Sequence, residues 1–288
     1  VFTAGMDIEI LAGFVEAAQK AEEEIAKERE AKGESDRQKT GGRSIFMDLY
    51  AMVARNHMEK YGTTQRQLAA ISSKNHYHSS MNPLAQYQKK WSIEEVMNDV
   101  EVAFPLTRAM CAPIGDGAAA LILCSDDYAK KTGTSRSVEI AATLLASGET
   151  TVDGEEEPMT RLAKKAYERA GIGPEDISFA EVHDATAFGE LGNTEALMFC
   201  KKGEGGPFAE AGHTTLGGKI PINVSGGLEC QGHPVGATGA RQAVELFLHL
   251  TGQAGERQVK DAKVGLAQNG GGTIGNSEAA LSIIILKK

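Results

Sequence analysis

The sequence of 288 residues is poor in cysteine and in aromatic residues, and it contains no long apolar run. Its four cysteines, Cys111, Cys124, Cys200 and Cys230, form no Cys-x-x-Cys pair and match no zinc-site spacing. We therefore expect no metal site and a reduced, cytoplasmic protein. No apolar run approaches the roughly 20 residues that cross a bilayer, and no secretory signal is recognisable at the start, so we expect no membrane partner.

Basic residues are also in the minority. Lysine and arginine together number 30 against 39 aspartates and glutamates, which gives a formal net charge of -9. We expect no nucleic-acid partner, because binding to phosphates favours a basic face. The hydrophobic share of 41% and the charged share of 24% are typical of a globular protein, and the chain is long enough for one large domain or two ordinary ones.

Apolar spacing divides the chain into a helical first part and an alternating second part. Residues 6–100 are mostly helical in pattern, with a charge-dense stretch at 16–39 and an amphipathic helix at 45–61. Later apolar runs predict strands at residues 118–124, 138–145, 177–182, 263–267 and 279–286. Amphipathic spacing predicts helices between them, at residues 158–170, 188–200 and 237–250. This alternation predicts an α/β layered domain with much parallel pairing.

The stretch from Asn223 to Gly239 is rich in glycine and holds a single histidine, His233, between Gly232 and Pro234. Glycine lets the backbone approach a ligand closely, and the N-terminus of the following helix favours an anion or an oxyanion. The proline restricts the backbone, which suits a side chain that must point one way. On composition alone, a binding loop and a glycine-rich turn with an incidental histidine are equally good interpretations.

This stretch resembles the Gly-His-Pro block of the thiolases. Further segments resemble, in order, blocks of the sterol-carrier-type thiolases: residues 57–62, 74–76, 82–83, 94–97, 116–120, 181–184 and 217–219. The resemblance covers essentially the whole chain, and several ordered blocks are far more specific than any single one. It implies an α/β thiolase fold with two βαβαβαββ-type repeats, layered α/β/α/β/α. The remainder of an incomplete N-terminal half would occupy residues 1–135, with a helical loop insertion at about 6–105, and the C-terminal half residues 136–288.

The resemblance also implies an activity and a set of roles. A thiolase cleaves a β-ketoacyl-CoA thiolytically or runs the reverse Claisen condensation, with coenzyme A as substrate and no other cofactor. His233 would activate the nucleophilic thiol and bind the thioester oxygen. His183 would donate to a substrate oxygen, and Asp184 would orient or polarise its surroundings. Without the resemblance, a structural histidine at a strand end would be the better interpretation of His183.

The remaining implied site residues belong to glycine-rich loops. Ser225, Gly226 and Gly227 would line the pantetheine channel, and Gly232 and Gly270 would contribute to binding of CoA or the oxyanion. Proton transfer to the leaving α-carbon would use His183, Asp184, a water held by Asn269, or the sulfur of the substrate. His76 and His78 alternate in sequence, and a surface pair is favoured over a pair of metal ligands.

Two catalytic thiols of the family have no counterpart in this sequence. The nucleophilic cysteine of thiolases lies upstream of the strand that residues 1–5 resemble, and none of the four cysteines matches its place. A second cysteine would follow His-Asp or lie in a loop near the C-terminus. Here Ala185 follows Asp184, and the corresponding loop reads Gln-Asn-Gly-Gly-Gly at residues 268–272. If the 288 residues were complete, we would expect the chain to be inactive as a thiolase.

Two other functions therefore stay open beside the thiolase. A thiolase-like retro-aldol lyase acting on a β-hydroxyacyl-CoA keeps the fold but needs no acyl-enzyme. A non-catalytic acyl-CoA-binding subunit is disfavoured because it would need neither His183 nor His233. Family resemblance implies a homo-oligomer, either a dimer or a tetramer, and a possible small partner subunit with a zinc ribbon and an OB-fold.

Overall fold

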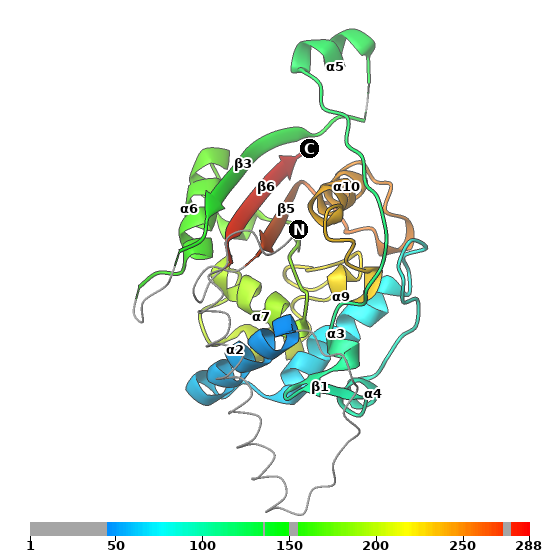
Figure 1. Ribbon diagram of the computed structural model, residues 1–288. Coiled ribbons are helices and arrows are strands. Elements are labelled where there is room, and N and C mark those ends of the chain that lie inside the picture. The colour runs from blue at the N-terminus through cyan, green and yellow to red at the C-terminus, as the bar shows by residue number, and fades with distance from the viewer. Residues whose placement is uncertain (1–44, 135, 150–154, 273–277) are drawn as a thin grey trace, which may run out of the picture.

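The computed structural model describes residues 45–134, 136–149, 155–272 and 278–288, so the helix and loop expected before residue 45 lie outside the described residues. Its first part contains the elements α2 (Ile45–Tyr61), α3 (Gln65–Ser79), α4 (Ile93–Met97), β1 (Glu101–Ala103), β2 (Leu106–Thr107) and α5 (Asp126–Thr132) (Figure 1). There follow β3 (Glu139–Ser147), α6 (Pro158–Ala170), β4 (Phe179–Glu181), α7 (Ala187–Ala196), α8 (Gly205–Glu210), α9 (Gly227–Gln231), α10 (Thr238–Leu250), β5 (Val264–Gly271) and β6 (Ala280–Lys287). No helix among these is long and apolar enough to cross a membrane.

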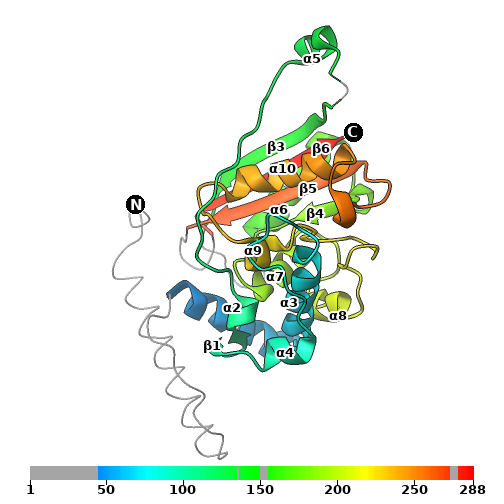
Figure 2. The same ribbon diagram turned by 90° about the vertical axis from the view of Figure 1, so that its right-hand side faces the viewer.

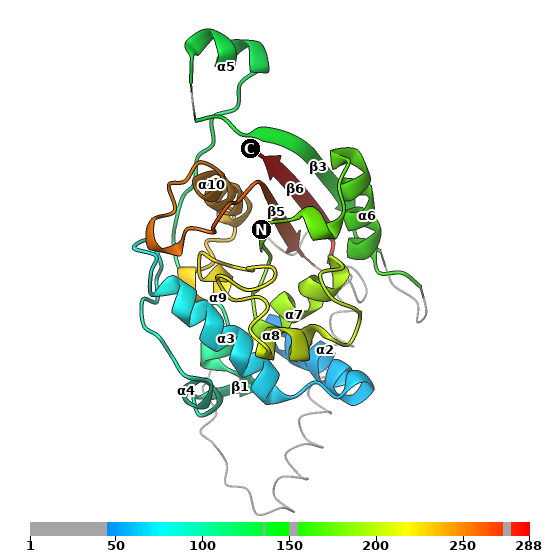
Figure 3. The ribbon, with the colours of Figure 1, turned by 180° about the vertical axis from the view of Figure 1, so that it is seen from behind.

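The main sheet has four strands in the order β3-β6-β5-β4. Only β4 and β5 pair in parallel; β3 with β6 and β5 with β6 are antiparallel, so the expectation of much parallel pairing is wrong. Strand β6 shows why both faces are covered. Its residues Leu281, Ile283 and Ile285 pack in the cluster of α6, while Ile284 and Leu286 pack in the cluster of α10. The two helices accordingly lie on opposite faces of the sheet (Figure 3).

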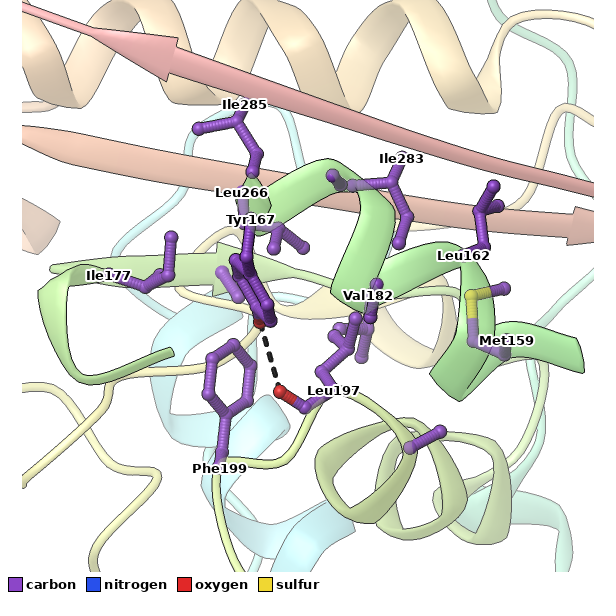
Figure 4. Packing of buried hydrophobic residues seen from close by; sticks show 14 of the residues in the cluster. Met159, Leu162, Tyr167, Ile177, Val182, Leu197, Phe199, Leu266, Ile283 and Ile285 are labelled. Carbon is purple, nitrogen blue, oxygen red and sulfur yellow. Dashed lines mark hydrogen bonds between the residues drawn. The ribbon is translucent and has the colours of Figure 1, made fainter. Parts of the chain in front are cut away.

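Helix α6 forms where the sequence predicts it, because its signals are local. Pro158 occupies its first turn, and Gly171 ends it with a positive φ of 65°. Its buried stripe includes Leu162, Ala166 and Tyr167, which pack against β6 and the end of α7 (Figure 4). The Tyr167 hydroxyl donates to the Leu197 carbonyl oxygen at 2.9 Å, so this ring is buried without an unpaired polar atom.

The helical part of the chain is built around α3 (Figure 2). Thr64 and Gln67 form a capping box at its start, and its neighbours are α4, α7, α8 and α9. The apolar core of this part joins α2, α3 and α7, with members including Leu68, Ile71 and Leu191. Since α7 directly follows the turn after β4, this packing ties the helical part to the edge of the sheet.

Two expectations about the second half are wrong. Residues 118–124 form no strand, and Ile122 and Leu123 are 97% and 74% exposed, because no strand of the described chain lies beside them to pair with and cover them. Cys124 is likewise exposed and is not strand core. Helix α10 is present, and its buried face carries Gln242, Leu246 and Leu250. Its spacing predicts a buried stripe, of which Ala243 alone is buried and the rest is half-buried: Ala240, Val244, Phe247 and Leu248. The division between residues 135 and 136 stays a prediction.

Candidate active site

Three chain segments end at the same edge of the sheet. β4 and β5 run in parallel with Glu181 beside Ala267, and Ile222 bridges Ala180 in the same sense on the other side of β4. The carboxyl ends of parallel strands meet at one edge, which is where open α/β sheets bind ligands. His183 follows β4, Ser225 follows the Ile222 segment, and the end of β5 carries Asn269.

His183 and His233 meet at this edge. Their ring centroids are 5.2 Å apart and the ring planes are inclined at 82°, an edge-to-face arrangement. The backbone of His183 is fixed on both sides, since its N–H donates to Gln268 Oε1 at 2.9 Å and its carbonyl accepts from Asn193 Nδ2 at 3.1 Å. Its Nδ1 is buried and has no hydrogen-bond partner within the described residues. A buried ring nitrogen of this kind is suited to a polar group of a ligand.

The His233 ring is held by the start of α10. Its Nδ1 lies 2.8 Å from Thr238 Oγ1, and that hydroxyl donates to the Pro234 carbonyl at 3.2 Å. Because the hydroxyl has only one proton, Nδ1 is the donor in the first contact and Nε2 keeps its lone pair. Arg241 Nη1 donates to the carbonyl of Gly232 at 2.5 Å, which fixes the residue before the histidine.

Both imidazoles are neutral at neutral pH. Burial, and then the neighbouring His233, lowers the pKa of His183 to about 3. Burial, and then Arg241, lowers the pKa of His233 to about 4. A neutral imidazole can accept a proton or donate a hydrogen bond, so the pair can perform acid–base work on a thiol or on a substrate oxygen.

Asp184 makes its hydrogen bonds to other elements and makes none to His183. Its Oδ1 accepts from the Leu228 N–H of α9 at 2.7 Å, and its Oδ2 accepts from Asn75 Nδ2 of α3 at 3.2 Å. Burial raises its pKa well above the usual range, and Glu229 and Glu190 add to the effect. A β-carbon on Gly227, at φ +64°, would overlap the Asp184 carboxylate, which is why glycine is required there. Asp184 therefore contacts α9 and α3, and its role in orienting the surroundings of the site stays a prediction.

The predicted pantetheine-lining residues are buried behind the histidine loop. Ser225 donates to the carboxylate of Glu181 twice, through its N–H at 3.0 Å and its hydroxyl at 2.6 Å. The N–H of Gly227 donates to Ser225 Oγ, and Gly226 lies against Ser79. Burial raises the pKa of Glu181 to about 7, with Glu245 adding and the Ser225 bonds opposing. A role of these three loop residues in the channel stays a prediction.

Asn269 and Gly270 lie beside α10. Asn269 Nδ2 donates to Gln242 Oε1 at 2.8 Å, and Gln242 Nε2 donates to the Gln268 carbonyl at 2.9 Å, so this amide pair joins β5 to the helix that holds His233. Gly270 is buried against the side chain of Glu278. Residues 115–119 and 234–237 line a groove next to the Gly-His-Pro segment, and Gly232 is buried against the side chain of Gln86. No contact joins Asn269 directly to either histidine within the described chain.

The four cysteines differ in exposure. Burial raises the pKa of Cys111 and of Cys230, and it raises the pKa of Cys200 to about 12. Cys124 is exposed. Because the thiolate is the nucleophile, burial makes Cys230 a poor one even though it is close to His233 in sequence.

Several supporting residues were not singled out from the sequence. The two histidines are positioned by Thr238, Gln268 and Arg241. In the sequence, only the closeness of these residues to the Gly-His-Pro block and to the loop of residues 268–272 could have indicated this role. The expectation that His76 and His78 form a surface pair is wrong, since both lie buried on α3. His76 stacks between Tyr87 and Trp91, and His78 contacts the Asn223 carbonyl and accepts from the Leu216 N–H.

The fold and site together define an α/β protein with a pair of neutral histidines at the edge of a sheet. Residues 145–286 match the family described as Thiolase C-terminal domain-like. The chain is 45% identical to the Acetyl-CoA acetyltransferase of Methanothermobacter thermautotrophicus, over 81% of this chain and 62% of that protein. It is 42% identical to Sterol carrier protein 2 of Bos taurus, over 78% of this chain and 43% of that protein. A third relative, the Benzoylsuccinyl-CoA thiolase subunit BbsB of Thauera aromatica, is 38% identical over 75% of this chain and 57% of its own length.

A solved structure described as "Ltp2-ChsH2(DUF35) aldolase" has the same fold, with a TM-score of 0.68 at 21% identity, over 84% of this chain and 63% of that chain. The chain therefore belongs to the thiolase superfamily, and the expected thiolase fold and sterol-carrier-type resemblance are confirmed. It spans less than two thirds of the length of the curated relatives described above.

Proposed function

We propose that this chain supplies the thioester-handling half of a thiolase-type acyltransferase, which cleaves a β-ketoacyl-CoA with coenzyme A or runs the reverse condensation. The observation that carries the proposal is the edge-to-face pair of His183 and His233, both neutral and 5.2 Å apart between centroids. In the proposed reaction His233 accepts the proton of a nucleophilic thiol through Nε2, and His183 hydrogen-bonds the substrate carbonyl. The acyl group specificity stays open, and we place the protein in the cytoplasm as part of the same proposal.

The residues around the pair support this division of roles. The Thr238 hydroxyl fixes the tautomer of His233, and Gln268 and Asn193 fix the backbone of His183. The contact between Nδ1 and Thr238 therefore limits rotation of the His233 ring, and the two backbone contacts fix the point from which the His183 side chain projects. Oriented donors of this kind are among the larger contributions to catalysis of acyl transfer.

A retro-aldol lyase acting on a β-hydroxyacyl-CoA is the second candidate. It is favoured because Ala185, not a cysteine, follows Asp184 and because burial raises the pKa of both Cys111 and Cys230, which disfavours their thiolates. The name of the structural relative, an aldolase, agrees with it. In either reaction we propose that the protein works as an oligomer or with a partner subunit, as the word "subunit" in the name of one relative suggests.

Intact mass spectrometry of the full-length native protein with acetoacetyl-CoA distinguishes the two candidates. A thiolase gains an acyl group on a cysteine and releases acetyl-CoA. Cleavage of a β-hydroxyacyl-CoA to a ketone or aldehyde, with no adduct at any time, would replace the thiolase by the lyase.

The variants His233→Asn and His183→Asn test the site itself. We expect each to lower kcat/KM by about 10²- to 10⁴-fold, the range for a positioned acid or base. His213→Gln is the matched control, because His213 contacts Phe208 away from the pair, and it should retain activity. Wild-type rates in both pair variants would contradict the assignment.

A further inference from the structure

Beneath the two histidines lies a buried set of charged and amide side chains from separate elements, which we call the carboxylate cluster. Its members are Lys74 and Asn75 of α3, Asp184 after β4, Glu190 of α7 and Glu229 of α9. Asn75 and the three carboxylates are fully buried, and Lys74 is 7% exposed. Sequence reasoning placed only Asp184 in the site.

Counting hydrogens shows that the cluster holds an additional proton. Asn75 Nδ2 lies 3.2 Å from Asp184 Oδ2, 3.0 Å from Glu190 Oε2 and 3.1 Å from Glu229 Oε2. An amide nitrogen has two hydrogens, so it cannot donate fully to three carboxylate oxygens. If the amide were flipped, its oxygen would face three acceptors, and the need for a proton on a carboxyl group would be greater.

The distribution of donors points to Glu229 as the main site of that proton. Glu190 receives Lys74 Nζ at 2.5 Å and Asn223 Nδ2 at 2.8 Å in addition to Asn75. Asp184 receives the Leu228 N–H on its other oxygen. Glu229 accepts from Asn75 on Oε2 and interacts more weakly with the Ser72 hydroxyl, whose proton is directed to the Ala109 carbonyl at 2.6 Å. Its Oε1 has no hydrogen-bond partner within the described residues. Lys74 offsets one of three negative charges, and an unpaired buried carboxylate is far costlier than a neutral carboxylic acid.

Among the other titratable groups around the cluster, the cation Arg241 interacts favourably with Asp184, but it is not among the groups that stabilise the charge of Glu229. Tyr50 of α2 and Arg241 of α10 interact with Asp184, and Cys111 and Cys230 interact with Glu229. The pKa values of Tyr50, Cys111 and Cys230 are raised, so these groups stay neutral and take no proton from the carboxylates at neutral pH. Burial raises the pKa of Glu229 to about 8, in agreement with the count of hydrogens.

We propose that Glu229 is a positioning residue that is protonated at neutral pH, and that its contact with Asn75, which also contacts Asp184, holds α9 against the turn that carries His183. Asp184 directly follows His183, and Glu229 lies four residues before His233. The cluster thus joins the two backbone segments that present the histidines. Ionisation of Glu229 adds a buried negative charge next to Asp184 and loosens this junction. The protonation state stands on the geometry alone; its effect on the histidines rests on the proposed function.

Infrared spectroscopy of Glu229→Gln tests the protonation state without any substrate. Glutamine has the shape of a neutral glutamic acid and no ionisable proton. At pH 7 we expect the difference spectrum between wild type and variant to show the loss of a protonated carboxyl band. Glu195→Gln is the matched control: Glu195 is buried, but its hydrogen bonds to His57 and to the Gly205 N–H lower its pKa, so no such band should be lost. An unchanged carboxyl band in Glu229→Gln would overturn the proposal.

Asp184→Asn provides a second variant should Glu229→Gln fail to fold. Removing the neighbouring acid lowers the cost of ionising Glu229, so the carboxyl band that titrates at the highest pH in wild type should titrate at a lower pH in this variant. A titration at the same pH in variant and wild type would also contradict a proton held on Glu229.

The pH dependence of turnover tests the positioning role. Above the pKa of Glu229 the wild-type kcat/KM should fall by up to about tenfold per pH unit, as for a single ionisation, while Glu229→Gln keeps a flat profile there. Parallel profiles would show that Glu229 does not position the histidines. If no CoA thioester is turned over, the proposed function fails, and the infrared result still decides the protonation state.

Discussion

At the scale of single residues, the site combines neutral histidines with carboxyl groups that burial holds protonated or nearly so. The two effects have the same cause, because desolvation disfavours the charged form of both acids and bases. It lowers the pKa of His183 to about 3 and raises that of Glu181 to about 7. Acid–base chemistry at this sheet edge therefore starts from uncharged groups, which suits an uncharged thiol and a thioester as reactants.

Replacing His183 should make the protein less sensitive to acid. The pKa of His183 is lower in the folded than in the unfolded chain, so the unfolded chain binds more protons as the pH falls below 6.5 and stability is lost in that direction. Between pH 7 and pH 5 the wild type should lose about 2 kcal/mol that His183→Asn does not lose, from 1.36 kcal/mol per pKa unit. Urea unfolding at both pH values measures this, and an equal loss in wild type and variant would sink the assignment of a neutral, buried His183.

At the scale of secondary-structure elements, α10 both presents His233 and is anchored at its far end. Glu245 accepts two hydrogen bonds from Arg257, at 2.7 Å from Nε and 2.9 Å from Nη2, and both side chains are almost fully buried. His249 also contacts Glu245. These contacts hold the pKa of Glu245 below its usual value against the opposing effect of burial. The start and the end of the helix are thus fixed by different side chains.

Removing one partner of this ion pair should cost more than removing both. We expect Arg257→Leu to lower the free energy of unfolding by about 3–5 kcal/mol, because Glu245 would be left as an uncompensated buried charge. The double variant Glu245→Met with Arg257→Leu should recover much of that loss. Denaturant unfolding of the single and double variants checks this, and additive losses would contradict a buried pair.

The sequence predicts the features that depend on neighbouring residues and misses those that depend on contacts between distant segments. α6 was placed correctly because Pro158, Gly171 and the apolar spacing all lie within it. The strand predicted at residues 118–124 is wrong, because an apolar run forms a strand only where another strand pairs with it and buries its side chains. His183 and His233 were found through the family resemblance, since nothing local brings them together. The carboxylate cluster was missed because its members come from four separated segments. Each acidic residue, taken alone, is expected at the surface.

At the scale of the whole molecule, several strongly exposed apolar residues lie in the segment before α5 and on β3. Ile122 and Leu123 lie in the extended segment that leads to α5, and Leu145 lies on β3, whose outer edge no strand of the described chain pairs. In Figures 1 and 2 this segment and β3 run toward α5, which stands away from the other elements. An open strand edge and adjacent exposed apolar side chains both favour association with another chain.

We therefore expect the 288-residue chain to self-associate through this region, and lysine at two positions should prevent it. Ile122→Lys combined with Leu123→Lys places charge on two adjacent, strongly exposed apolar residues of the segment, where a dry contact would have to bury both ammonium groups. Sedimentation velocity over a range of concentrations should show a shift from oligomer toward monomer in this variant. Leu84→Lys is the matched control: Leu84 is 77% exposed but lies in a different segment, so its substitution should leave association unchanged. Equal sedimentation of wild type and double variant would mean that copies of the chain associate elsewhere or not at all.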